Sequence, residues 1–243
     1  MRNFFVILGG MGTLASESFV HQLNQQTPAT CDQDYCNYIL ANHATIPDRT
    51  DYIIGKSQDN PLDSLQEDIE QLSALTPDFF VLTCNTAHYF HDQLQAVTDI
   101  PILHMPRIAV QAIPSELPHS AEHPLRVSVL GTEGTMKIGV YRQAVEAQGY
   151  QYCPPSADLQ AKITHLIYHE VKGYKRLNVA LLEEIIRQAQ TELNCDVVIL
   201  GCTELSYVYA ETDCFGGNPP LPIIDAQGEL VTATLARYTH PHH

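Results

Sequence analysis

Short apolar runs alternate with longer segments of helical periodicity along the whole chain. Runs of this uniformly apolar kind are typical of parallel strands buried on both faces. The expected strands are Phe4–Leu8, Tyr38–Ala41, Phe79–Leu82, Val127–Leu130 and Val197–Leu200. Helical patterns begin at about Leu14, cover 62–75, follow Asn85, and return at 140–148, 159–171 and 177–193. The alternation predicts an α/β fold made of βαβ units.

An internal repeat divides the chain into two similar halves. Residues 7–13 (ILGGMGT) and 129–135 (VLGTEGT) share the pattern apolar-Leu-Gly-x-x-Gly-Thr. Residues 78–84 (DFFVLTC) and 196–202 (DVVILGC) share an Asp, three apolar residues, a Leu and a Cys six places after the Asp. The glycine turn precedes the cysteine by 75 positions in the first half and by 71 in the second. The two halves are therefore the same structural unit.

The repeat predicts two pseudo-symmetric lobes, each a parallel sheet flanked by helices, with a site in the cleft between them. We assign residues 1–105 plus 210–243 to the N-terminal lobe and 106–209 to the C-terminal lobe. The proline-containing stretch Pro114–Pro124 is expected to be a surface connection between them. The last amphipathic pattern, which ends at Tyr238, is expected to return and pack on the first lobe.

Charge and cysteine content narrow the possible functions. With 13 basic and 28 acidic residues the formal charge is −15, which repels nucleic acid and anionic membrane surfaces. The apolar run after Arg2 is cut short by Gly9, before it reaches the length of a signal peptide core. Seven cysteines without a CxxC pair favour reduced thiols. We expect a cytoplasmic protein without nucleic acid or membrane partners.

Cys84 and Cys202 each follow a strand and precede a helical stretch, at the sheet edge where open α/β folds bind ligands. A helix N-terminus favours the thiolate form of such a cysteine. If the lobes face each other, one thiolate can remove an α-proton while the opposite thiol protonates the other face. This pair predicts a racemase. The other cysteines are interpreted as small buried hydrophobes, and they are Cys31, Cys36, Cys153, Cys195 and Cys214.

Three motifs, Gly9-Gly10-Met11-Gly12, Thr83-Cys84-Asn85-Thr86-Ala87-His88 and Gly201-Cys202-Thr203-Glu204, resemble the aspartate/glutamate racemase family, its aspartate-racemase branch especially. The resemblance spans nearly the whole chain. It implies two α/β lobes, catalysis without pyridoxal phosphate or metal, a small acidic amino-acid substrate and a homodimer. Glutamate racemases of cell-wall synthesis carry an acidic-Ser start and Gly-Cys-Thr-His, so the resemblance disfavours a dedicated glutamate racemase.

The resemblance also implies substrate contacts. Arg49 matches the family arginine that meets a substrate carboxylate, and Lys172 matches the second cation of the aspartate branch. A surface charge at Arg49 and a helix C-terminal role for Lys172 before Gly173 are the alternatives. The remaining candidates line or flank the pocket, with side-chain and backbone donors for the α-carboxylate. They are Met11, Thr83, Asn85, Thr86, Thr132, Thr203 and Glu204.

Other interpretations stay open from the sequence. The GxGxxA pattern from Gly10 to Ala15 is typical of a dinucleotide-binding dehydrogenase, but the following strand ends in Asn42 rather than an acid. A one-thiol decarboxylase or cis-trans isomerase of the same fold, or a non-catalytic binding protein for small dicarboxylates, are further alternatives. His88 either tunes the thiol or packs in the core, and the tail 239–243 either binds a metal or is solvated.

Overall fold

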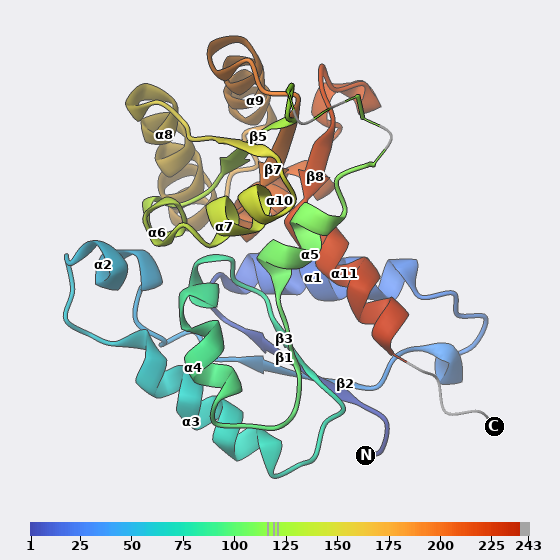
Figure 1. Ribbon diagram of the computed structural model, residues 1–243. Coiled ribbons are helices and arrows are strands. Elements are labelled where there is room, and N and C mark those ends of the chain that lie inside the picture. Colours follow the sequence, from blue (N-terminus) through green and yellow to red (C-terminus); the bar gives the residue numbers. More distant parts are fainter. Residues whose placement is uncertain (116, 119, 121, 239–243) are drawn as a thin grey trace.

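The computed structural model describes residues 1–115, 117, 118, 120 and 122–238. These residues form two four-stranded parallel sheets, one in each of two stacked lobes (Figure 1). The α/β class expected from the apolar runs is confirmed. Among the described residues, none of the helices is long and apolar enough to cross a membrane.

The first sheet has the strand order β2-β1-β3-β4. Its strands are β1 (Phe5–Gly9), β2 (Tyr38–Asn42), β3 (Phe80–Leu82) and β4 (Ile102–Leu103). β1 is central, since Val6 pairs with both Ile39 and Phe80. The helical elements of this half are α1 (Thr13–Gln26), η1 (Asp32–Asp34), α2 (Arg49–Ile54), α3 (Pro61–Ser73), η2 (Thr86–Phe90), α4 (His91–Gln95) and α5 (Met105–Gln111).

The second sheet repeats this order as β6-β5-β7-β8. Its strands are β5 (Arg126–Leu130), β6 (Gln151–Cys153), β7 (Val197–Leu200) and β8 (Ile223–Asp225). Its helical elements are α6 (Glu133–Ile138), α7 (Val140–Ala147), α8 (Ala157–Thr164), η3 (His165–Gly173), α9 (Val179–Leu193), α10 (Thr203–Ala210), η4 (Cys214–Gly217) and α11 (Ala226–Arg237). The two halves of the chain therefore have the same topology, as the internal repeat predicted.

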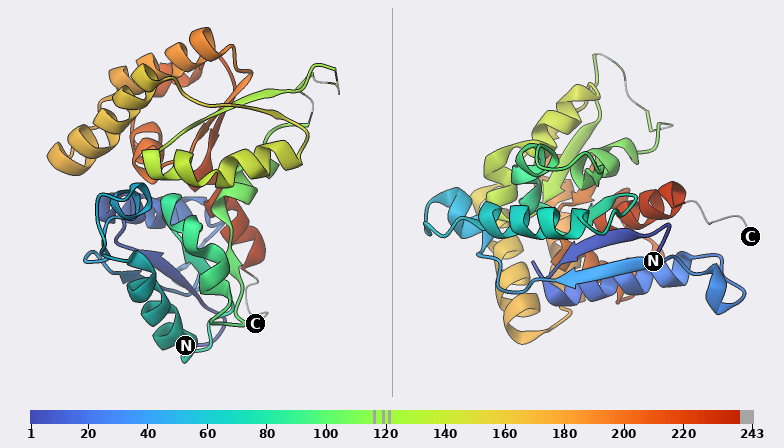
Figure 2. Two further views of the ribbon diagram at one scale, coloured as in Figure 1. Left: turned by 60° about the vertical axis from the view of Figure 1, so that its left-hand side comes forward. Right: turned by 90° about the horizontal axis from the view of Figure 1, so that it is seen from below.

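The C-terminal segment serves both lobes. β8 pairs with β7, so it belongs to the second sheet, and the assignment of all of residues 210–243 to the first lobe is wrong for this strand. The error arose because strand pairing is a contact between distant residues that a local pattern does not record. α11 then packs on α1 and α5, beside the first sheet (Figure 2). The other lobe boundaries remain a proposal.

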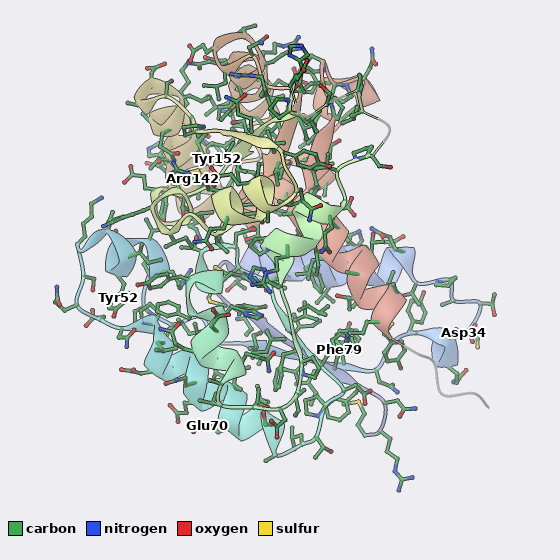
Figure 3. All side chains as sticks on the ribbon, viewed as in Figure 1. Asp34, Tyr52, Glu70, Phe79, Arg142 and Tyr152 are labelled. Atoms are coloured by element: carbon green, nitrogen blue, oxygen red, sulfur yellow. The ribbon has the colours of Figure 1, made fainter. Side chains whose placement is uncertain are left out.

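Apolar side chains pack on both faces of each sheet and stabilise its lobe. β1, β3, β5 and β7 are almost wholly buried, which explains their uniformly apolar sequences. In the first lobe the ring of Phe79 stacks on that of Phe5, with centroids 4.9 Å apart. In the second lobe Arg142 lies 5.3 Å from the ring centroid of Tyr152, near the sheet edge (Figure 3).

Two predicted helices differ in detail from the structure. The segment after Asn85 is the 3-10 helix η2, because the Cys84 carbonyl accepts from the His88 side chain while the His88 N–H bonds to Asn85. The pattern at 159–171 splits into α8 and η3, a π-helix. Residues 116, 119 and 121 of the predicted surface connection, and the tail 239–243, lie outside the described residues.

Candidate active site

A pocket lies between the lobes at the carboxyl ends of the central strands. Its walls come from turns after β1, β3, β5 and β7, together with α2 and η3. The lining residues are Met11, Asp48, Arg49, Thr50, Cys84, Asn85, Thr86, Thr132, Tyr168, Lys172, Cys202, Thr203 and Glu204. Both cysteines, from equivalent positions of the two halves, thus line one pocket.

The structure brings together all of the sequence-predicted site residues except Thr83. The Thr83 hydroxyl bonds to the Leu8 carbonyl and to Ser16, so this side chain faces the interior of the first lobe. Its position follows from the alternation of side chains along a strand, because its neighbour Cys84 faces the pocket.

The pocket also contains three residues that sequence reasoning missed, Asp48, Thr50 and Tyr168. Tyr168 precedes Lys172 by four positions, and this helical spacing was a usable signal, because it places both side chains on one helix face. The Lys172 ammonium lies 5.9 Å from the Tyr168 ring centroid. Asp48 caps the N-terminus of α2 through the N–H of Asp51, and its carboxylate accepts a bond from the Tyr168 hydroxyl of the other lobe over 3.5 Å.

Cys202 belongs to a buried charged cluster. It occupies the N-cap of α10, and its thiol donates to Glu204 Oε2 over 2.9 Å. The other oxygen of Glu204, Oε1, forms an ion pair with the Lys172 ammonium over 2.6 Å. Burial, and then the Glu204 carboxylate, raise the pKa of Cys202 well above its usual value. Cys202 is accordingly a protonated thiol.

The Glu204 carboxylate is charged despite its burial. Burial by itself raises the pKa of Glu204, but the ammonium of Lys172 and the Cys202 thiol lower it below its usual value. The pKa of Lys172 is in turn raised, because attraction to Glu204 outweighs the opposing effect of burial. A neutral thiol and a compensated ion pair therefore form one side of the pocket.

Cys84, on the other side, lies beside a guanidinium. Arg49 is buried, and its two terminal nitrogens donate to the backbone carbonyls of Ile46, Pro47 and Met11 over 2.7 to 3.2 Å. Burial opposes the charge of Arg49, but interaction with Cys84 raises its pKa above the usual value. A fixed positive charge next to a thiol favours the thiolate. The two cysteines thus have opposite electrostatic surroundings.

Hydrogen bonds between the lobes fix the polar residues beside Cys84. The Tyr141 hydroxyl donates to Asn85 Oδ1 over 2.5 Å. The Thr86 hydroxyl lies 2.9 Å from those of both Thr132 and Thr135, at the N-terminus of α6. Because Tyr141, Thr132 and Thr135 belong to the second lobe, closure of the lobes orients Asn85 and Thr86.

Two buried donors in the pocket have no protein partner. Asn85 Nδ2 and Arg49 Nε are both shielded from solvent and make no hydrogen bond within the described residues. An unpaired buried donor costs free energy of about 1 to 3 kcal/mol unless a ligand satisfies it. Two such N–H groups, on residues that line one pocket, suit an anionic oxygen such as that of a carboxylate.

The pocket is closed in this conformation. The volume open to the centre of a water molecule is about 10 Å³, roughly the space of one water. An amino acid does not fit until the lobes separate or the side chains rearrange. Closure removes water from the thiols, which strengthens electrostatic interactions inside the site.

The glycine turn after β1 closes on protein atoms rather than on an anion site. Gly10 has φ +87°, and a Cβ there would overlap the backbone of His43. A Cβ on Gly12 would overlap Glu204 Oε1, whose negative charge faces the turn. A pyrophosphate at this position would meet a carboxylate, so the dinucleotide-binding interpretation of this turn is disfavoured.

His88 supports Cys84 from behind the pocket. The Met105 N–H donates to His88 Nε2 over 3.0 Å, so the ring proton is on Nδ1 and is donated to the Cys84 carbonyl over 2.8 Å. Burial lowers the pKa of His88 to about 4, which keeps it neutral. His88 therefore fixes the backbone of Cys84 and does not line the pocket of the two cysteines.

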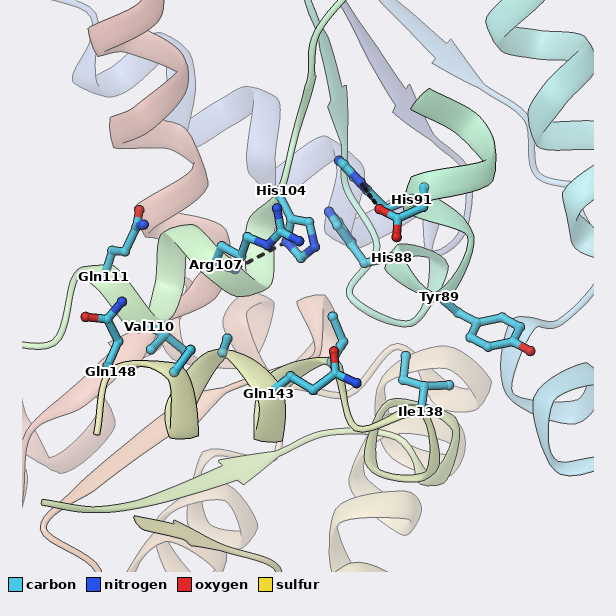
Figure 4. Close-up of a pocket in the computed structure, with 14 residues that line it drawn as sticks. His88, Tyr89, His91, His104, Arg107, Val110, Gln111, Ile138, Gln143 and Gln148 are labelled. Atoms are coloured by element: carbon cyan, nitrogen blue, oxygen red, sulfur yellow. Dashed lines mark hydrogen bonds and ion pairs between the residues drawn. The ribbon is translucent and has the colours of Figure 1, made fainter. Parts of the chain in front are cut away.

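A larger cavity of about 470 Å³ lies on the far side of η2 (Figure 4). His88 and His104 face it from the first lobe, and Gln143 on α7 faces it from the second (Figure 4). Burial is the main cause that lowers the pKa of His104 to about 3. No thiol is among the residues that line this cavity, so it is separate from the pocket of the two cysteines.

The other cysteines mostly pack as expected. Cys36, Cys153, Cys195 and Cys214 are buried, but Cys31 is exposed, so its interpretation as a buried hydrophobe is wrong. Cys31 lies at the start of the short η1 turn rather than in a strand or core helix.

Two α/β lobes of identical topology, with one cysteine from each at a shared, closed pocket, define the class of two-lobe amino-acid racemase folds. The family model for Asp/Glu/hydantoin racemases matches residues 8–234. The chain belongs to this family, as the three motifs of the sequence indicated.

Individual proteins agree with this assignment. The chain is 26% identical over 247 residues to the broad specificity amino-acid racemase RacX of Bacillus subtilis (strain 168). The alignment covers 96% of this chain and 96% of RacX. Its fold is similar to that of Picrophilus torridus aspartate racemase, with a TM-score of 0.75, 23% identity and coverage of 97% of this chain and 96% of that one. Glutamate racemase from Francisella tularensis subsp. tularensis SCHU S4, in complex with D-glutamate, has a TM-score of 0.61 at 16% identity, covering 96% and 79%.

Proposed function

We propose that this amino-acid racemase interconverts L- and D-aspartate by exchange of the α-proton between two cysteines. The observation that carries the proposal is the presence of Cys84 and Cys202 in one closed pocket, on turns that follow equivalent strands of opposite sheets. Two bases on opposite sides of a carbon can invert its configuration, because proton removal from one face and delivery to the other need no rotation of the substrate.

The two cysteines have different roles in the proposed reaction. Cys84, beside the Arg49 guanidinium, is proposed as the base that removes the α-proton of one enantiomer. Cys202, whose pKa is raised by burial and by Glu204, is the thiol that protonates the opposite face. After this step Cys84 carries the proton and Cys202 is the thiolate. The reverse reaction, starting from the other enantiomer, restores the first state.

Glu204 and Lys172 position the proton that Cys202 delivers. The Cys202 thiol donates to Glu204, so this carboxylate orients the thiol until its proton passes to the substrate. Lys172, 2.6 Å from Glu204, remains near the negative charge whichever of the two groups carries it. We propose that catalysis needs no pyridoxal phosphate, as the family resemblance implies.

The unpaired donors on the Cys84 side support an anionic substrate. Asn85 Nδ2 and Arg49 Nε are proposed to bind carboxylate oxygens, with the hydroxyls of Thr86 and Thr132 and the N-terminal turn after Cys202 as further donors. Met11 and Thr203 complete the wall. The carboxylate oxygens of the substrate would then supply the hydrogen-bond acceptors that Asn85 Nδ2 and Arg49 Nε lack in the closed protein.

A broader amino-acid range is the second candidate. Lys172 is already neutralised by Glu204, which leaves less positive charge for a side-chain carboxylate than two free cations would provide. The curated relative RacX is a broad specificity enzyme. We also propose that the protein is cytoplasmic, because its cysteine content favours reduced thiols, and that it is a homodimer, as the family resemblance implies.

The test is ¹H NMR of the purified protein in D₂O with L- and D-aspartate, both glutamates and a set of neutral amino acids, without added cofactor, alongside chiral chromatography. Loss of the α-proton signal with inversion for aspartate supports the proposal, and faster turnover of neutral amino acids favours the broader range. Exchange of none of them, by a protein that is folded by circular dichroism, overturns it and favours the one-thiol or binding-protein alternatives.

A further inference from the structure

His165, His169 and Glu170 form a cluster on η3, outside the pocket of the two cysteines. His165 Nε2 lies 3.4 Å, and His169 Nδ1 3.5 Å, from the same oxygen, Glu170 Oε1. The two imidazole rings stack with centroids 4.4 Å apart. All three candidate ligand atoms lie within 4.8 Å of one another.

The π-helical backbone creates this grouping. In an α-helix, residues four apart share a face but residues five apart do not. The wider turn of a π-helix, which bonds residue i to i+5, moves both His169 and Glu170 onto the face of His165. π-Helical turns are rare and are found frequently at functional sites.

Glu170 is a buried carboxylate with weak compensation. Its side chain is 10% exposed, and within the described residues its ion-pair partners are these two histidines, at the long distances given above. A buried carboxylate is costly unless it is paired with a cation or coordinates a metal. The histidine side chains are about half exposed, so an ion from solvent can reach them.

We propose that His165, His169 and Glu170 bind a divalent transition-metal ion of the zinc class, with water in the remaining coordination positions. Tetrahedral ligands at zinc distances lie about 3.4 Å apart, close to the separations of both histidine nitrogens from Glu170 Oε1. Two imidazoles and a carboxylate are a donor set that zinc accepts. The ion would neutralise Glu170 and connect two turns of η3.

The proposed metal site lies on η3, the same helix that contributes residues to the cysteine pocket. Tyr168 and Lys172 lie on η3, and both line the cysteine pocket. Metal binding would therefore fix the π-helical turn that positions them. The metal site itself is independent of the proposed aspartate racemisation, since it requires none of the pocket residues.

The experiment is titration of the full-length protein with Zn²⁺ by calorimetry, in a background with His240, His242 and His243 replaced by Ala, because these residues supply competing imidazoles. We expect one equivalent of Zn²⁺ to bind, and to bind at least tenfold more weakly after His165→Ala, His169→Ala or Glu170→Gln. His21→Ala, which removes an exposed histidine from α1, is the matched control and should leave binding unchanged. Circular dichroism without metal verifies that each variant is folded.

Co²⁺ absorption distinguishes this site from the thiols, because cysteine ligation adds an intense charge-transfer band that histidine and carboxylate ligands lack. A stoichiometric Co²⁺ spectrum without that band, lost in His165→Ala, supports the proposal. Binding that persists in the His165 and His169 variants, a thiolate band, or no binding of Zn²⁺ at all would overturn it and leave only histidine–glutamate ion pairs.

Discussion

The Cys202 thiol donates a hydrogen bond to Glu204 Oε2 over 2.9 Å, two residues further along the chain at the start of α10. The negative oxygen holds the proton on the sulfur, and burial of both side chains strengthens the effect. Thr86 stands two places after Cys84, where the second half of the chain has Glu204, so the carboxylate beside Cys202 has no counterpart at this position of the repeat. The repeat thus places two cysteines, Cys84 and Cys202, in different electrostatic surroundings.

Glu204→Gln should lower the pKa of Cys202, because it removes the negative charge and leaves Lys172 to attract the thiolate. The measurement is a pH titration of thiolate ultraviolet absorbance in a Cys84→Ser background, taken as the difference from the Cys84→Ser/Cys202→Ser protein. Glu204→Asp keeps the charge and is the matched control. An unchanged titration would refute a role for Glu204 in holding the thiol form.

Cys84→Ser and Cys202→Ser should each reduce racemisation of aspartate by at least about 100-fold, the lower range for loss of a positioned acid or base. Cys202→Ser should still exchange the α-proton of one enantiomer with D₂O, without inversion, since Cys84 remains as the proposed base. Cys31→Ser, at an exposed thiol, is the control. Full turnover in either pocket variant would contradict the two-base mechanism.

Gly12→Ala should reduce kcat/KM by more than about tenfold, since each lost 1.4 kcal/mol of transition-state stabilisation is a factor of ten. Gly12 has φ −160°, which alanine adopts freely, so the effect should come from the overlap of the new Cβ with Glu204 Oε1. Adding Glu204→Asp, which shortens that side chain, should recover part of the loss. If the double variant is no better than Gly12→Ala, the overlap is not the cause.

His88→Gln should flatten the dependence of stability on pH. The pKa of His88 is lowered from 6.5 to about 4 in the folded protein, so only the unfolded chain takes up this proton between those values. The contribution of the neutral His88 ring to the unfolding free energy is complete above about pH 6.5 and is lost as the pH falls toward 4. The difference amounts to about 3 kcal/mol of unfolding free energy.

Urea unfolding of wild type and His88→Gln at pH 7 and at pH 4.5 measures this difference. The wild-type protein should lose more unfolding free energy over that range than the variant does. His21→Gln, at an exposed position, should behave as the wild type. Parallel pH profiles for wild type and His88→Gln would show that His88 is not buried as a neutral ring.

The internal repeat predicted the paired sheets and placed Cys84 and Cys202 at equivalent strand ends, because buried strands and glycine turns leave local patterns in a sequence. Short edge strands such as β4 and β6 left too few residues for such a pattern. The family match and the fold agree with the prediction, whereas the roles of the two cysteines remain to be tested.

The sequence by itself determined the α/β class, the two matched halves and the set of polar residues near each cysteine. Only the tertiary structure decided that Thr83 faces the interior, that β8 joins the second sheet, and that Tyr168 reaches Asp48 across the lobes. It likewise decided that Glu204 pairs with Lys172 beside Cys202. The physical reason is that these outcomes depend on contacts between residues far apart in the chain, which the packing of two lobes sets and local propensity does not.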